Sequence, residues 1–310
     1  VQTALKAIYN HDNPNPTNSN TFVTITVPDG KRNTRTTTTT ETYKLTDLQS
    51  NNGHAPLFAS VLPTNTNMDQ VEMSDFVDAS GTPIGYVPRP LVHKYNLLHR
   101  GIGIVVSRDE HITNANVDDV PSPLSSLPDV YVHRRTDTKR IFPSLYDMFV
   151  GGVSTAGEDL RLTAAREVAE ELGLVNSDRS LSDHPLFRCT ICTSYNRCVV
   201  TVYTYRFEPS SSLSGGGSGR GDVIRWQKEE VSWGDFVPYD VVQRAGALSI
   251  GRLLEAGKWP GLDSDVRKVL EDVDGTAVEG GQEDEWDFVP DGLLVWVAWL
   301  EWMASSKKIK

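Results

Sequence analysis

The chain has few cysteines and no long apolar segment. Only three of its 310 residues are cysteine, too few for a disulfide framework. Cys189 and Cys192 form one CxxC motif without a second pair, in a stretch that reads as a strand. We therefore interpret both, together with Cys198, as buried free thiols rather than as a redox or metal site. No run of about 18 apolar residues occurs, which excludes a transmembrane helix.

Positive charge is also scarce. The chain has 30 Lys and Arg against 41 Asp and Glu, for a net charge of −11. This balance argues against a broad nucleic-acid surface and against an anionic membrane as a partner. With 38% hydrophobic residues, the chain can bury a sizeable core. We expect a cytoplasmic protein, or an organellar one if a transit peptide ahead of Val1 has been lost.

The first 56 residues differ in composition from the rest. They are rich in Asn, Thr, Pro and Ser, include five threonines at 36–40, and alternate like a strand only over 21–27. Such a segment buries too little apolar surface to offset its ordering entropy. We expect a poorly structured arm over 1–56 and one domain over 57–310.

The remaining pattern alternates strands with helices. Apolar and β-branched runs predict strands, and longer stretches rich in helix formers predict helices. Strands are expected at 101–106, 130–134, 148–150 and 198–207, a hairpin at 76–87, a short helix or turn at 89–98, helices at 241–256 and 292–303, and a Ser/Gly-rich loop at 210–221.

The most informative stretch is 151–174, GGVSTAGEDLRLTAAREVAEELGL. Asp159 is a suitable N-cap, residues 160–172 are good helix formers without Gly or Pro, and Gly173 stands where a left-handed C-cap is wanted. The sequence therefore predicts a helix over 160–172. Its apolar face should contain Ala165, Val168, Ala169 and Leu172.

The opposite face of this helix is acidic. Glu167, Glu170 and Glu171 stand at i, i+3 and i+4 and repel one another by about 0.2–0.5 kcal/mol per pair. A hard cation such as Mg²⁺ or Mn²⁺ would remove that repulsion. The alternative is a solvated acidic face, which the fixed spacing to Gly152, Glu158 and Arg166 argues against. Because Arg166 is the one cation of the group, it can hold Glu158 or a helix glutamate in a fixed rotamer.

Two further stretches offer groups for phosphate chemistry. Residues 134–140, RRTDTKR, contain four cations and form either a solvated turn or a clamp for a diphosphate. Glu229 and Glu230 precede a strand-like stretch. One of them could supply a metal ligand or a general base, or both could lie in an exposed acidic loop.

The spacing over 152–174 is identified as that of a Nudix box. The chain therefore resembles the Nudix hydrolases, whose fold is an α/β/α sandwich around a mixed sheet. The order of LLHRGIGIVV, VHRRTDTKRIFPSLYDMFVGG and FVPDGLLVWVAWL also resembles the isopentenyl-diphosphate-isomerase-like branch of that superfamily, over roughly residues 70–303.

This resemblance implies roles for individual residues. Glu167, Glu170 and Glu171, together with the Gly152 carbonyl, would bind Mg²⁺ or Mn²⁺. Glu158 and Arg166 would orient these carboxylates. Arg135 and Lys139 would hold the diphosphate. We expect Glu170, Glu171 and Glu230 to be catalytic. Glu230 is chosen over Glu229 because Glu230 directly precedes the next strand.

One departure from that branch decides between two reactions. Isomerases carry Cys-Gly-His just ahead of the box, where this chain has Val150-Gly151-Gly152. We therefore predict hydrolysis of the phosphoanhydride bond in a nucleoside-diphosphate-linked or other organic diphosphate, a small-molecule substrate. An isopentenyl-diphosphate isomerase and a non-catalytic diphosphate-binding regulator remain as alternatives. A homodimer is also compatible with the sequence.

Overall fold

The computed structural model describes residues 22–28, 38–44, 71–108, 128–174, 180–209, 222–261 and 281–307. The chain divides into two compact units. One comprises Val1–Arg100 and Thr155–Gly157, and the other Gly101–Ser154 and Glu158–Lys310. The expected boundary at residue 56 and the Ser/Gly-rich loop at 210–221 lie outside the described residues.

The first unit contains two antiparallel strand pairs. Strands β1 (Phe22–Pro28) and β2 (Thr38–Lys44) pair along their full length. The threonine-rich stretch, for which the sequence predicted no element, thus provides β2. Strands β3 (Met73–Val77) and β4 (Pro83–Pro88) form the expected hairpin. It is followed by the short helix α2 (Arg89–Tyr95).

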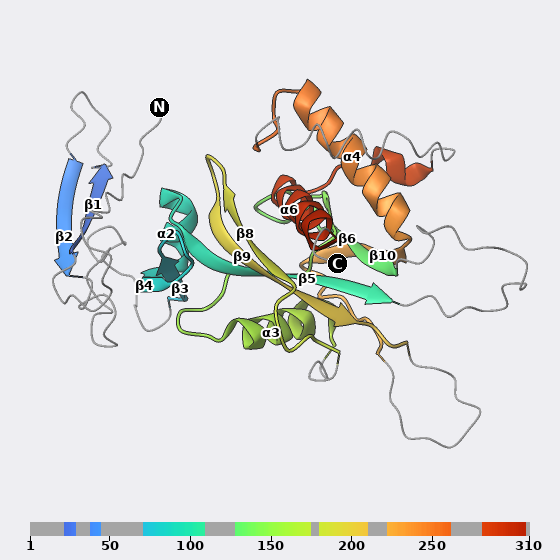
Figure 1. The fold of residues 1–310 in the computed structure, drawn as a ribbon, viewed down its shortest axis with the longest axis horizontal. Coiled ribbons are helices and arrows are strands. Elements are labelled where there is room, and N and C mark those ends of the chain that lie inside the picture. The colour runs from blue at the N-terminus through green and yellow to red at the C-terminus, as the bar shows by residue number, and fades with distance from the viewer. Residues whose placement is uncertain are drawn as a thin grey trace, which may run out of the picture. The chain divides into compact units, whose positions relative to one another are not determined.

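The second unit is built on one curled sheet (Figure 1). Strand β6 lies between β10 and β5 and also pairs with the short β7, while β9 pairs with both β5 and β8. A parallel bridge joins Tyr146 to Phe288, so the sheet is mixed. The strands are β5 (His99–Arg108), which begins in the first unit, β6 (Asp129–Arg135), β7 (Tyr146–Asp147), β8 (Phe187–Cys192), β9 (Arg197–Arg206) and β10 (Val231–Val237).

Helices cover both faces of this sheet. Helix α3 (Leu160–Leu172) lies on one face, and α4 (Tyr239–Glu255) and α6 (Pro290–Lys307) lie on the other (Figure 1). Two buried clusters follow from the strand alternation of β5, because Ile104 packs with the α3 side and Val105 with the α4 and α6 side. The expected α/β/α sandwich is confirmed.

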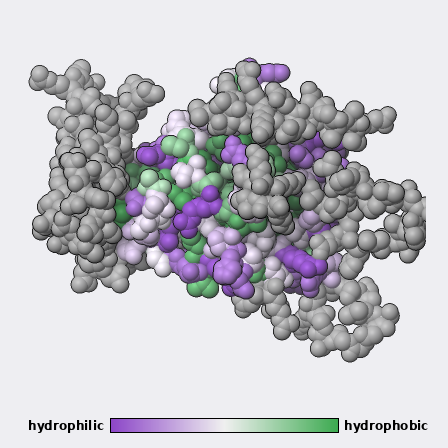
Figure 2. Space-filling model, viewed as in Figure 1, coloured by the Kyte–Doolittle hydropathy of each residue, from purple (hydrophilic) through white to green (hydrophobic). Residues whose placement is uncertain are grey.

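The last helix is longer than the sequence predicted. It begins at Pro290, with a short 3₁₀ turn (η2, Gln282–Glu285) ahead of it, and continues to Lys307 rather than ending at 303. Leu293 and Trp296 are fully buried against the sheet, whereas Trp302 is 37% exposed. Among the described helices, none is long and apolar enough to cross a membrane. On the coloured part of the face in Figure 2, hydrophilic and hydrophobic side chains are interspersed.

The CxxC motif lies on β8 as expected, and its cysteines are free. Cys198 is buried and Cys189 is half-buried, but Cys192 is exposed, so the expectation that all three are buried is wrong for Cys192. Strand alternation explains the difference, since residues three apart on a strand point to opposite faces.

Candidate active site

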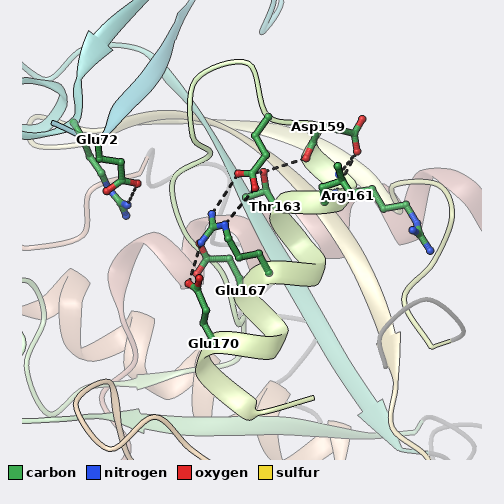
Figure 3. Close-up of polar contacts among 10 residues, drawn as sticks. Glu72, Asp159, Arg161, Thr163, Glu167 and Glu170 are labelled. Atoms are coloured by element: carbon green, nitrogen blue, oxygen red, sulfur yellow. Dashed lines mark hydrogen bonds and ion pairs between the residues drawn. The ribbon is translucent and has the colours of Figure 1, made fainter. Parts of the chain in front are cut away.

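Helix α3 has the bounds that the sequence predicted, and its ends are capped locally. The Asp159 side chain accepts hydrogen bonds from the backbone N–H of Arg161 at 2.9 Å and of Leu162 at 3.2 Å (Figure 3). At the other end, Gly173 adopts the left-handed conformation with φ 69°. Both caps satisfy backbone groups that a helix terminus leaves unpaired.

The buried face of α3 is rotated slightly from the predicted one. Ala164, Val168 and Leu172, spaced by four residues, are fully buried, whereas Ala165 and Ala169 are only half-buried. This rotation also brings Glu167 inward, where its residue is 7% exposed. The acidic face is therefore graded from a buried Glu167 to an exposed Glu170, rather than being uniformly solvated.

One guanidinium organises the first group of carboxylates. Arg166 Nη1 lies 2.9 Å from Glu167 Oε1 and 3.0 Å from Glu170 Oε2, and its Nε lies 3.3 Å from Glu158 Oε1 (Figure 3). Burial alone would lower the pKa of Arg166, but the hydrogen bond that Arg166 donates to Glu158 and the nearby glutamate charges raise it. We call Arg166, Glu158, Glu167 and Glu170 the Arg166 cluster; the predicted contact of Arg166 with Glu158 and with helix glutamates is present.

Gly152 provides room for this cluster. A Cβ placed on Gly152 would lie 3.0 Å from Glu167 Oε1, which is tighter than ordinary contact, so a side chain here would displace that carboxylate. The Gly152 carbonyl accepts a hydrogen bond from Ile102 N at 2.9 Å, which leaves it one further lone pair. Glycine at this position therefore allows the close approach of the Glu167 carboxylate.

A second group of carboxylates surrounds Glu171. Burial raises the pKa of Glu171 well above its ordinary value, and the negative charges of Glu167, Glu230 and Asp147 raise it further. Lys139 opposes this rise and forms an ion pair with Glu230. We call Glu171, Glu230, Asp147 and Lys139 the Glu171 cluster. It joins α3 to β7, to the turn before β10 and to the loop after β6.

Asp147 is a member of this cluster that the sequence analysis missed. It lies on β7 opposite His133, and its Oδ1 accepts a hydrogen bond from Phe149 N at 3.1 Å. Burial raises the pKa of Asp147 to about 6, although the Arg135 charge opposes the rise. The available signal was a lone carboxylate inside the otherwise apolar YDMFV stretch just before Gly151.

The cations predicted to bind phosphate come from β6 and the loop after it. Arg135 donates from Nε to the Phe142 carbonyl at 3.2 Å and from Nη2 to the Ile141 carbonyl at 3.1 Å. Lys139 is held by Glu230. Glu229 is exposed, whereas Glu230 is half-buried, so the structure brings the expected glutamate, and not its neighbour, into the cluster.

The donors of the two clusters match a hard divalent cation in type and charge. Each offers carboxylate oxygens, and the Glu171 cluster has three carboxylates against one lysine. Within the described residues, no three His, Cys, Asp or Glu side chains have the arrangement of a metal site. Oxygens of Glu167, Glu170 and Glu230 instead face Arg166 and Lys139.

Comparisons with known proteins identify the family of the chain. The NUDIX domain profile matches residues 126–249. An uncharacterized Nudix hydrolase of Streptomyces coelicolor is 30% identical over 235 residues, covering 76% of this chain and 92% of the relative. An uncharacterized Nudix hydrolase of Rhodococcus erythropolis is 31% identical over 156 residues, covering 50% of this chain and 72% of the relative.

A crystal structure from Deinococcus radiodurans has 19% identity and a TM-score of 0.39, covering 64% of this chain and 98% of that one. The profile and the sequence relatives are sufficient by themselves to assign the family. The chain belongs to the Nudix hydrolases, which hydrolyse pyrophosphate bonds, and we assign it as such an enzyme.

Proposed function

We propose that the protein is a Mg²⁺- or Mn²⁺-dependent hydrolase that cleaves the phosphoanhydride bond of a nucleoside-diphosphate-linked or other organic diphosphate. The observation that carries this proposal is Glu171, whose partly buried carboxylate has the carboxylates of Glu167, Glu230 and Asp147 around it and one lysine nearby. A protein that only needed a stable core would not gather these charges, because they repel in a medium of low dielectric.

The box residues would hold the cation. Glu167, Glu170 and Glu171, with the remaining lone pair of the Gly152 carbonyl, are its proposed ligands, and Arg166 and Glu158 orient them. When bound, the cation would screen the diphosphate charge and acidify the attacking water. Without a cation, Arg166 and Lys139 neutralise part of the carboxylate charge.

The remaining residues act on the substrate and on protons. Arg135 and Lys139 would bind the diphosphate oxygens, since both offer charged donors. A water oxygen attacks one phosphorus, the bridging P–O bond breaks, and Glu230 accepts the proton of the water. The products would be two phosphorylated fragments, or a monophosphate and phosphate.

We also propose that the chain lies in the isopentenyl-diphosphate-isomerase-like branch, on the order of its segments, but without isomerase activity. Val150 takes the place of the isomerase cysteine, is 1% exposed and bridges to Ile104. Cys198 is the buried cysteine near this region, and burial raises its thiol pKa, which disfavours a reactive thiolate. Cys198 therefore does not take over the role of the isomerase cysteine.

The test is release of phosphate or monophosphate from a panel of diphosphate-linked metabolites with Mg²⁺ or Mn²⁺. Wild type is compared with Glu171→Gln and with Glu255→Gln, which changes an exposed glutamate at the end of α4. We expect metal-dependent turnover that Glu171→Gln abolishes and Glu255→Gln keeps. Allylic product without phosphate release, or binding without turnover by the wild type, would contradict the proposal.

A further inference from the structure

We propose that Phe142 and Tyr195 form an aromatic platform that binds the organic group of the substrate and selects a planar ring, such as a nucleobase. The inference rests on the proposed hydrolase function and assigns the substrate class of the same site. The two rings come from distant parts of the chain, the loop after β6 and the turn between β8 and β9. Their centroids lie 5.7 Å apart with planes inclined by 73°.

The platform is open to solvent, whereas most other aromatic side chains among the described residues are packed, Trp226 and Trp302 excepted. Tyr195 is 39% exposed, Ile141 beside Phe142 is 42% exposed, and Phe142 itself is half-buried. An edge-to-face pair leaves at least one ring face free, and that face carries the negative quadrupole on which planar groups stack. The corner between the rings therefore matches a flat ligand better than a flexible chain.

The loop that carries Phe142 is held in a strained conformation. Phe142 has φ 52° and Ser144 has φ 63°, a region that bulky L-residues rarely adopt. Arg135 maintains this conformation by donating to the carbonyls of Ile141 and Phe142. Strain of this kind persists where the surrounding structure over-determines it, and it concentrates at functional sites.

Tyr195 is supported equally firmly. Its turn is closed by hydrogen bonds from Thr193 N to the Asn196 carbonyl and from Asn196 N to Thr193 Oγ1, both 2.8 Å. Asn196 Nδ2 also donates to Asp291 Oδ2 at 2.7 Å, which ties the turn to the start of α6. A rigid aromatic side chain loses little entropy when a ligand stacks on it.

The platform adjoins the phosphate-binding end of the proposed site. The guanidinium predicted to hold the diphosphate is the one that bonds the Phe142 carbonyl, and Lys139 of the same loop is anchored on Glu230. The loop base is fixed as well, because Thr136 Oγ1 donates to the Glu229 carbonyl at 2.9 Å. A diphosphate bound by Arg135 would therefore place its organic group beside Phe142.

The experiment compares two substrates that share a diphosphate but differ in the organic group, ADP-ribose and geranyl diphosphate. Phe142→Leu and Tyr195→Leu keep an apolar side chain and remove the ring, whereas Phe142→Tyr keeps the ring. Trp302→Leu removes an equally exposed aromatic ring from the far end of α6 and serves as the control. Melting curves establish that each variant is folded.

We expect the two leucine variants to lower kcat/KM for ADP-ribose by roughly 5- to 100-fold through KM, with kcat and the turnover of geranyl diphosphate nearly unchanged. Phe142→Tyr should recover most of the ADP-ribose turnover that Phe142→Leu loses, and Trp302→Leu should behave like wild type. Equal losses on both substrates, no loss on either, or a wild-type preference for geranyl diphosphate would overturn the platform.

A separate readout distinguishes this inference from the proposed function. If the wild type hydrolyses neither substrate, the hydrolase proposal in its present form fails, and the platform is then judged by calorimetric binding of ADP. Weaker ADP binding by both leucine variants, with Trp302→Leu unaffected, supports the platform independently of turnover. Unchanged ADP binding overturns it.

Discussion

The two acidic clusters share one helix but differ in how their charges are neutralised. In the Arg166 cluster, a guanidinium reaches three carboxylates within 3.3 Å, so the negative charge is largely compensated inside the protein. In the Glu171 cluster, three carboxylates share one lysine and the pKa of Glu171 is raised. Glutamates of the same helix thus differ in charge balance. The Arg166 cluster is largely neutralised, whereas the Glu171 cluster keeps an excess of negative charge.

The difference separates carboxylates that have a cationic partner within the protein from carboxylates that largely lack one. A compensated cluster stabilises the folded state and is fully satisfied without a ligand. An uncompensated cluster is costly until a cation or a proton arrives, and strongly perturbed carboxyl groups of this kind are characteristic of active sites. We therefore propose a positioning role for Arg166 and a cation-binding and catalytic role for Glu171, and each proposal can be tested.

The largest effect is expected from Glu171→Gln. Loss of a catalytic carboxylate should lower kcat/KM by about 10²–10⁴-fold, while the metal-free protein should become more stable, because a desolvated charge among like charges is removed. Activity assays and thermal denaturation without metal measure the two effects. Glu170→Gln is the matched control, since Glu170 is paired with Arg166 and its loss should not raise metal-free stability. A Glu171→Gln protein that melts lower than wild type would contradict the comparison.

Arg166→Met should destabilise the fold by about 2–3 kcal/mol, because it leaves three carboxylates without their charged partner. Urea denaturation measures the change in the free energy of unfolding. Arg166→Lys keeps the charge but not the forked donors and should lose less. If Arg166→Met unfolds at the wild-type urea concentration, the Arg166 cluster does not stabilise the fold.

The cationic side of the site predicts a pH dependence through His133. Burial, followed by the charges of Arg135 and Lys139, lowers the pKa of His133 to about 3. The folded state then binds fewer protons than the unfolded state between about pH 6.5 and pH 3, so stability from this residue is present above about pH 6.5 and is lost as the pH falls. Between about pH 7 and pH 5 the loss is about 2 kcal/mol.

Urea denaturation of wild type and His133→Gln at several pH values checks this prediction. Glutamine cannot be protonated in this range, so the variant should show a flatter acid dependence than wild type. Asp147, opposite His133 on β7, has a raised pKa and contributes a slope of the opposite sign between about pH 4 and pH 6. An identical slope in both proteins would show that His133 is not buried in its neutral form.

The smallest effect is expected at the N-terminal cap of α3, the helix that contributes residues to both clusters. Asp159→Ala removes the two hydrogen bonds to Arg161 N and Leu162 N and should destabilise the protein by about 1 kcal/mol. The turnover number should be nearly unchanged, because Asp159 belongs to neither cluster. A large loss of kcat with little change in melting temperature would instead place the cap in the chemistry.

The local elements followed closely from the sequence. The bounds of α3, both of its caps and the strands β5, β6 and β9 were predicted to within a few residues, because periodicity and capping chemistry depend on neighbours along the chain. The prediction of the buried face of α3 was less accurate, since Ala164 and not Ala165 lies in the core. A rotation of this size depends on the surface against which the helix packs.

The sequence by itself determined the box spacing, the acidic helix face and the presence of cations near 135–139, all of which are local patterns. Only the tertiary structure decided that Asp147 joins Glu171, that Lys139 pairs with Glu230 across 91 positions, and that Phe142 meets Tyr195. These contacts arise from strand pairing and helix packing between distant segments. No local periodicity encodes them, so the charge balance that distinguishes the two clusters could be established only in the folded chain.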